Sequence, residues 1–193
     1  MFIKNWKKEL FSIPNLLSMF RLILIPVYIR IYLNATEPEH YYVAGGILAV
    51  SCLTDMIDGQ IARHFNMISN VGKLLDPLAD KMTQLALTLC LSVKYPALRS
   101  VLLLFVIKEL FQASVTFVMF RRGKVLPGAL IPGKVCPVVL FISLIAMVLF
   151  PNMHTLVVNS IAIVDALFLA FSFVSYILAY YGKNTKVENY RPE

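Results

Sequence analysis

Four aspartates in an apolar stretch are the residues of this chain best suited to chemistry. Asp55 and Asp58 are three positions apart, and Asp76 and Asp80 are four apart. If each pair lies on a helix, its two carboxylates project from one face. Ionisable groups among membrane-type apolar residues are costly, and they usually line a cavity or meet a partner. The spacing therefore predicts two carboxylate pairs with a functional role.

A short turn over residues 64–70 would bring the two pairs together, because the helices on either side of it become antiparallel neighbours. Carboxylates that converge in a poor dielectric repel each other unless cations neutralise them. Hard divalent cations such as Mg²⁺ and Mn²⁺ prefer oxygen ligands, and no His or Cys stands at a spacing that suits zinc. We expect a divalent-cation site whose ligands are Asp55, Asp58, Asp76 and Asp80.

Two glycines share the expected carboxylate faces. Gly59 follows Asp55 by four positions, and Gly72 precedes Asp76 by four. A glycine lets a ligand approach the helix backbone closely, although small residues also serve simply to pack two helices. Their register with the four aspartates favours the ligand interpretation.

The composition indicates a membrane protein. Of 193 residues, 59% are hydrophobic and 15% are charged, whereas soluble domains are closer to half apolar and a quarter charged. Six segments are long enough to span a bilayer, namely 14–33, 41–61, 71–93, 97–120, 135–150 and 155–181. We expect one domain over residues 1–193, an all-α membrane protein of six transmembrane helices.

The segment 2–12 precedes the first span and alternates apolar and basic residues. Its apolar residues could share one helical face, which predicts an amphipathic helix lying in the membrane interface. The alternative is a disordered basic tail. We expect no cleavable signal here, because the apolar run that follows is too long and lacks a small-residue cleavage site.

The basic residues give the expected orientation. The net charge of +7 could suit nucleic acid, but Lys and Arg lie mainly at the ends of apolar runs, where they face anionic headgroups. We therefore expect no nucleic-acid partner. The positive-inside rule places both termini and the aspartates on the cytoplasmic side of the cell membrane. Pro127, Pro132 and Pro137 stand before and within the start of the fifth span, and they predict an irregular link there instead of a regular helix.

The aspartate stretch resembles a known signature. Asp55-x-x-Asp58-Gly59-x-x-Ala62-Arg63, eight further residues and Gly72-x-x-x-Asp76-x-x-x-Asp80 match the CDP-alcohol phosphotransferases at every fixed position. The six-span layout is also similar to that family. The resemblance covers nearly the whole chain.

The resemblance implies an enzyme that transfers a phosphatidyl group from CDP-diacylglycerol to an alcohol in a bilayer. It implies two divalent cations, Mg²⁺ or Mn²⁺, with Asp80 acting as general base besides binding metal. The resemblance also implies a pocket for the cytidine diphosphate moiety, formed by Asp55, Asp58, Gly59, Ala62, Arg63 and Gly72. Arg63 would offset pyrophosphate charge, and homodimers are common in that family.

The acceptor alcohol is read from weaker features. Segments 13–26 and 76–81 are similar to phosphatidylglycerophosphate synthases and related cardiolipin synthases. The residues that would bind an acceptor phosphate are Arg21, Lys108 and Lys134. Arg21 could instead be an interfacial charge, and Lys108 could pair internally with Glu109. We expect glycerol 3-phosphate as acceptor, with phosphatidylglycerol as the alternative, because Cys136-Pro137 departs from the Lys-Thr of the glycerophosphate enzymes.

Two other classes explain fewer of these residues. An intramembrane prenyltransferase would need a second Asp-rich motif far from the first, and beyond Asp80 the last two spans contain the lone Asp165. A divalent-cation transporter would suit intramembrane carboxylates, but it would not need the glycines in register or Arg63. Asp165 could pair with a neighbouring span or line the cavity, and the sequence does not decide between the two.

Overall fold

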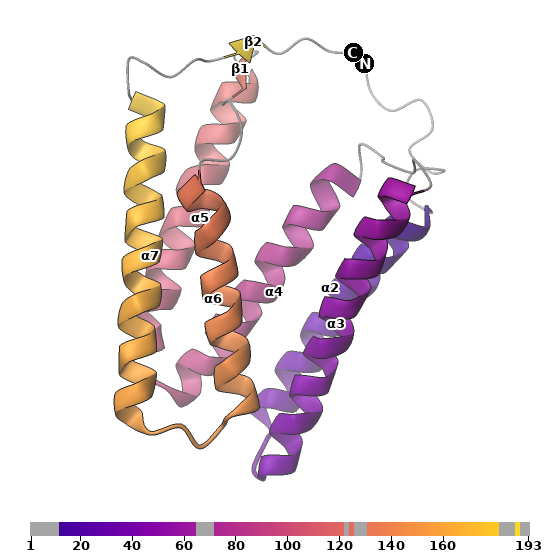
Figure 1. Ribbon diagram of the computed structural model, residues 1–193, viewed down its shortest axis with the longest axis vertical. Helices are drawn as coiled ribbons and strands as arrows, with labels where there is room; N and C mark the ends of the chain where they lie inside the picture. The colour runs from indigo at the N-terminus through magenta and orange to yellow at the C-terminus, as the bar shows by residue number, and fades with distance from the viewer. Residues whose placement is uncertain (1–11, 65–71, 122–123, 126–130, 182–187, 190–193) are drawn as a thin grey trace. The chain divides into compact units, whose positions relative to one another are not determined.

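The computed structural model describes residues 12–64, 72–121, 124–125, 131–181 and 188–189. Over these residues the chain forms α2 (Ile13–Leu33), α3 (Pro38–His64), α4 (Gly72–Lys94), α5 (Leu98–Arg121), α6 (Ile131–Leu149) and α7 (Thr155–Tyr181) (Figure 1). Two short strands, β1 (Lys124–Val125) and β2 (Glu188–Asn189), pair antiparallel. The predicted helical fold is confirmed at all six segments, whereas the predicted interfacial helix lies outside the described residues except for Ser12.

Three of the helices have the length and composition of membrane spans. Within the part of the chain that the structure describes, these are Asn15–Leu33, Leu98–Met119 and Thr155–Tyr180, and the apolar stretch Val135–Leu149 is shorter. Large apolar side chains also point outward from these helices, as expected where lipid is the solvent. Membrane spans in α3, α4 and α6 stay a prediction.

The start of α6 corrects the expected proline loop. The helix begins at Ile131, so Pro132 lies in its first turn and Pro137 lies inside it. Proline is tolerated in a first turn because the N–H groups there have no intrahelical acceptor. Inside membrane helices, neighbouring groups can satisfy the carbonyl that a proline leaves free. The prediction of an irregular chain was therefore wrong for residues 131–137.

The helices fall into two compact units. The first contains Met1–Cys90 and Ile145–Asn152, and in it α2 packs along α3. The ring of Tyr32 on α2 lies 5.2 Å from that of Tyr41 on α3 in an edge-on contact, and 5.7 Å from the ring of Tyr28. Ala44 of α3 is fully buried. This packing holds α2 against α3 next to the site described below.

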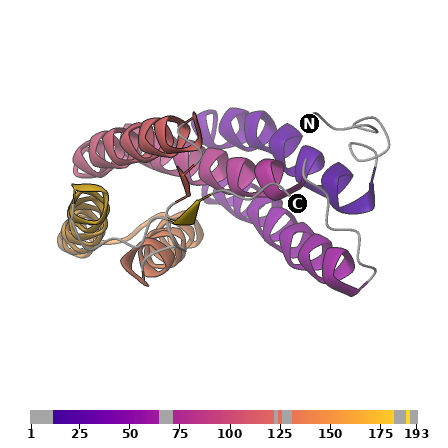
Figure 2. The same cartoon turned by 90° about the horizontal axis from the view of Figure 1, so that it is seen from above.

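The second unit contains Leu91–Leu144 and Met153–Glu193. Here α5 and α7 lie side by side (Figures 1 and 2). The rings of Phe111 and Phe173 meet edge to face with centroids 5.2 Å apart. Each unit has its own buried apolar residues, and the single domain over residues 1–193 stays a prediction.

Candidate active site

The two carboxylates of α4 lie near its beginning. Asp76 and Asp80 are one helical turn apart, so both side chains leave the same face of the helix. Asp76 is half-buried and Asp80 is exposed, with 53% of the Asp80 side chain accessible. Gly72, at the first position of α4, is buried. The face that carries the carboxylates is therefore partly open.

Helix α2 supplies a hydrogen-bond donor to each carboxylate. The Ser18 hydroxyl donates to Asp76 Oδ1 at 2.5 Å, and Arg21 Nη1 donates to Asp80 Oδ1 at 2.7 Å. Ser18 and Arg21 are three positions apart on α2, which matches the four-residue spacing of the two acceptors on α4. The two helices are thus joined at successive turns by one neutral and one charge-assisted hydrogen bond.

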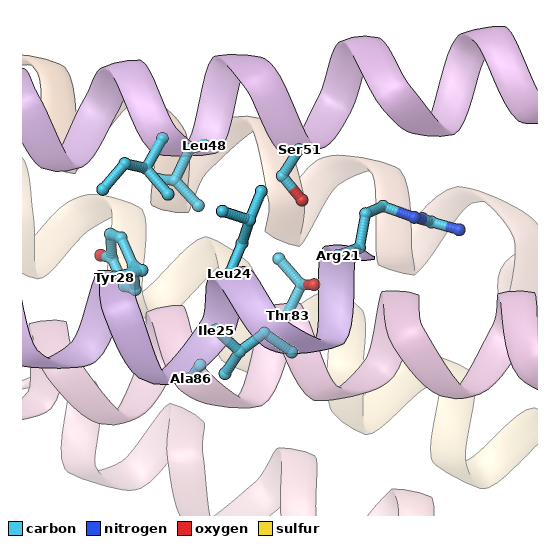
Figure 3. A pocket seen from close by; sticks show the side chains of 9 residues that line it. Arg21, Leu24, Ile25, Tyr28, Leu48, Ser51, Thr83 and Ala86 are labelled. Carbon is cyan, nitrogen blue, oxygen red and sulfur yellow. The ribbon is translucent and has the colours of Figure 1, made fainter. Parts of the chain in front are cut away.

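Arg21 reaches Asp80 from a buried position. The residue is 2% exposed, and its stem lines a hollow between α2, α3 and α4 with Leu24, Leu48 and Ala86. Figure 3 shows the guanidinium extending away from these apolar side chains. A charged group buried to this degree needs a partner of opposite charge, and Asp80 provides it. The hollow therefore directs the cation toward the α4 carboxylates.

For the predicted site residues on α3, the structure describes the backbone but not the side chains. Helix α3 runs unbroken through the positions of Asp55, Asp58, Gly59, Ala62 and Arg63, but the placement of their side chains lies outside the description. For Asp55 and Asp58 the helical backbone agrees with a shared face. Their convergence with the α4 pair, and the pocket for the cytidine diphosphate moiety, stay predictions.

The metal site also stays a prediction. Among the described residues no three His, Cys, Asp or Glu side chains come together as metal ligands, and the description includes two of the four predicted aspartates. Those two fit a hard divalent cation, because they offer carboxylate oxygens from one face of a helix and are accessible to solvent. Asp76 and Asp80 would hold the ion together with Asp55 and Asp58.

The predicted acceptor residues have different surroundings. Arg21 is held against Asp80 as described. Lys108 on α5 is 4% exposed, and its Nζ lies 2.6 Å from Glu109 Oε1, so the internal ion pair that the sequence allowed is present. The side chain of Lys134 lies outside the description. An acceptor role for these three residues stays a prediction.

Two polar contacts have partners that the sequence did not identify. Ser18 had no assigned role, although its spacing from Arg21 places both residues on one face of α2. Asp165 on α7 is 1% exposed and accepts a 2.6 Å hydrogen bond from the hydroxyl of Ser143 on α6. No local sequence signal identifies the second contact.

Comparison with known proteins yields several partial matches. The chain is 42% identical over 73 residues to the CDP-diacylglycerol–glycerol-3-phosphate 3-phosphatidyltransferase of Escherichia coli, covering 37% of this chain and 39% of that one. It is 40% identical over 117 residues to the cardiolipin synthase (CMP-forming) of Rattus norvegicus, covering 60% and 37%. A Schizosaccharomyces pombe cardiolipin synthase/mitochondrial hydrolase fusion protein is 38% identical over 90 residues, covering 46% and 14%.

These alignments span at most 39% of the length of the curated relatives. The match to a whole family is broader. The sequence model described as CDP-alcohol phosphatidyltransferase covers residues 11–177, which include the full stretch from Asp55 to Asp80 and all six helices in whole or in large part. As the aspartate signature predicted, the chain belongs to the CDP-alcohol phosphatidyltransferase family.

Proposed function

We propose that this protein transfers the phosphatidyl group of CDP-diacylglycerol to glycerol 3-phosphate and releases CMP. The observation that carries the proposal is the family match over residues 11–177. It is supported by the open face of α4 on which Asp76 and Asp80 lie one turn apart. The reaction would take place in the cell membrane, with the site and both termini on the cytoplasmic side.

The proposed chemistry assigns a role to each part of the signature. Asp80 takes the proton of the acceptor hydroxyl, the resulting oxygen attacks the lipid-linked phosphorus, and the bond from that phosphorus to CMP breaks. Arg63 and Gly59 belong to the pocket that holds the cytidine diphosphate moiety. The family generally uses divalent metals, and two such ions, Mg²⁺ or Mn²⁺, would supply charge stabilisation for the pyrophosphate when bound.

Asp80 is suitably placed for both of its proposed roles. Its side chain is accessible, so an acceptor hydroxyl can approach it, and a carboxylate has two oxygens with about four acceptor sites. The hydrogen bond from Arg21 to Oδ1 therefore leaves capacity for a metal ion and a proton. If Asp55 and Asp58 converge with Asp76 and Asp80 as proposed, the Arg21 cation would also offset the repulsion among the four carboxylates.

Phosphatidylglycerol is the second candidate acceptor, which would make the protein a cardiolipin synthase. The rat cardiolipin synthase aligns with 60% of this chain and the E. coli enzyme with 37%. In addition, Lys108 and Arg21 each contact a carboxylate, which reduces the positive charge available to a small dianionic acceptor. Both candidates share the donor lipid, the leaving group and the proposed base, and we propose a homodimer in either case.

An acceptor panel tests the proposal. Purified protein in detergent, with CDP-diacylglycerol and either Mg²⁺ or Mn²⁺, is assayed for CMP release with each acceptor in turn. We expect CMP release that depends on glycerol 3-phosphate and is lost when the metal is chelated. If only phosphatidylglycerol supports CMP release, the acceptor is phosphatidylglycerol and not glycerol 3-phosphate. If none of the tested acceptors supports CMP release, the proposal of phosphatidyl transfer is contradicted. Metal flux into vesicles without lipid turnover would support a transporter instead.

A further inference from the structure

We infer that α2 is a positioning element of the active site, in which Ser18 sets the orientation of Asp76 and Arg21 sets that of Asp80. The inference rests on the proposed function, because it assigns these two residues to the carboxylates proposed to hold metal and accept a proton. Neither residue is proposed to contact the metal or the phosphatidyl group. They act through the aspartates.

The distribution of exposure identifies α2 as the fixed partner. Ser18 is fully buried and Arg21 is 2% exposed, whereas Asp76 is half-buried and Asp80 is exposed. A buried side chain in a packed interface has few alternative rotamers, and an accessible aspartate has more freedom about its side-chain torsions. The two donors therefore restrict the acceptors, rather than the reverse.

The packing behind α2 supports this assignment. On the same helix, Tyr28 is 2% exposed and Tyr32 is 4% exposed, and Tyr32 is in ring contact with Tyr41 of α3. The apolar hollow holds the stem of Arg21 while its guanidinium extends outward (Figure 3). Since α2 packs along α3, both donors project from a helix that is itself held in place.

The two contacts differ in what they contribute. The hydrogen bond from the neutral hydroxyl of Ser18 fixes the direction of the Asp76 carboxylate without changing the charge of the site. Arg21 also offsets the charge of Asp80 through a 2.7 Å ion pair. Ser18 is thus the cleaner test of positioning, since its removal deletes neither a proposed ligand nor a charge.

The effect of losing such a contact is expected to be intermediate. Groups that orient metal ligands typically change metal affinity or activity by roughly 10- to 100-fold when mutated. We therefore expect Ser18→Ala to weaken Mn²⁺ binding by about 10-fold, and Ser18→Thr to retain most of the affinity because it keeps the hydroxyl. Ser172→Ala is the matched control, since Ser172 is a fully buried serine on α7, in the unit that does not contain Asp76 and Asp80.

The experiment measures Mn²⁺ binding to the full-length protein in detergent by titration calorimetry, independently of turnover. The expected order of affinity is wild type and Ser172→Ala, then Ser18→Thr, then Ser18→Ala, with Asp76→Asn weakest. CMP release under the same conditions should show a lower kcat for Ser18→Ala that excess Mn²⁺ partly restores. A structural role alone would change the melting temperature without changing the Mn²⁺ requirement.

The outcomes separate this inference from the proposed function. Unchanged Mn²⁺ affinity in Ser18→Ala, with Asp76→Asn impaired, would overturn the positioning role and leave the proposed function standing. Equal weakening in Ser18→Ala and Ser172→Ala would overturn it as well, because the effect would then be general to buried serines. A wild-type protein that neither binds Mn²⁺ nor releases CMP would overturn both.

Discussion

The two units of this protein place an aspartate in opposite surroundings. In the first, Asp80 is accessible and is held through one oxygen by Arg21 from another helix. In the second, Asp165 is 1% exposed, and its Oδ2 accepts a hydrogen bond from Ser143. Both residues lie on long helices of a mostly apolar chain. They differ in access to solvent and in the charge of the neighbour that is described.

This difference separates a carboxylate that is available for chemistry from one that is part of the packing. An accessible carboxylate costs little to keep ionised, and it can exchange ligands without disturbing its helix. A buried carboxylate requires hydrogen bonds for its oxygens, and losing such a contact costs about 1–3 kcal/mol. Asp80 should therefore matter chiefly for turnover, and Asp165 chiefly for stability.

The largest expected effect comes from the same substitution made in the two regions. Asp80→Asn removes the proposed base and a proposed metal ligand. We therefore expect the rate of CMP release to fall by about 10²- to 10⁴-fold while the protein stays folded. Asp165→Asn keeps an oxygen that accepts from Ser143, so its activity should stay near that of wild type. Steady-state CMP release and the melting temperature of each variant in detergent check both expectations.

Either of two results would contradict the assignment of Asp80 to turnover and Asp165 to stability. Near-normal turnover in Asp80→Asn would remove Asp80 as the base. A folded Asp165→Asn variant without activity would place Asp165 in the reaction, and access to solvent would then no longer distinguish the two carboxylates.

The sequence predicted the features that depend on local spacing. The positions of Asp76 and Asp80 on one face follow from the helical repeat, and the Lys108–Glu109 pair joins neighbours in the chain. The helix positions followed from the lengths of the apolar runs. In each case the information lies within a few residues.

Contacts between distant residues could not be read in the same way. Ser18 and Asp76 are 58 positions apart, and serines are too common in membrane helices for one to indicate a carboxylate partner. Asp165 and Ser143 are 22 positions apart on separate helices. Pro137 shows the opposite failure, because a local rule predicted a break and the helix continues through it.

An intermediate effect should come from the buried ion pair of the second unit. Lys108→Met removes a cation 2.6 Å from Glu109, and both side chains are largely buried at 5% and 16% exposure. Breaking such a pair on one side costs about 3 kcal/mol, whereas replacing both members by neutral groups is often close to neutral. The melting temperature should therefore fall in Lys108→Met and recover in Lys108→Met/Glu109→Gln.

The double variant also sharpens the acceptor question. If Lys108 binds the acceptor phosphate, Lys108→Met/Glu109→Gln should keep its stability and still show a KM for glycerol 3-phosphate raised by about 10-fold, which corresponds to about 1.4 kcal/mol. An unchanged KM in a stable double variant would leave Lys108 as a packing residue. The Lys108–Glu109 and Ser143–Asp165 contacts of the second unit would then both serve its structure.

The smallest expected effects compare a glycine from each unit. A Cβ on Gly133 would lie 2.2 Å from Tyr176 Oη and 2.9 Å from the ring of Tyr176, whereas nothing lies within 4 Å of a Cβ on Gly46. Gly133→Ala should destabilise the protein by about 1–3 kcal/mol, because the ring must move. Gly46→Ala should be neutral or stabilise α3 by about 0.5–1 kcal/mol, since alanine is the better helix former.

Melting temperatures of the two variants check these expectations. The double variant Gly133→Ala/Tyr176→Leu should lose less stability than the sum of the losses in the two single variants. If the losses are simply additive, Gly133 and Tyr176 are not coupled, and the contact between the start of α6 and α7 does not constrain residue 133.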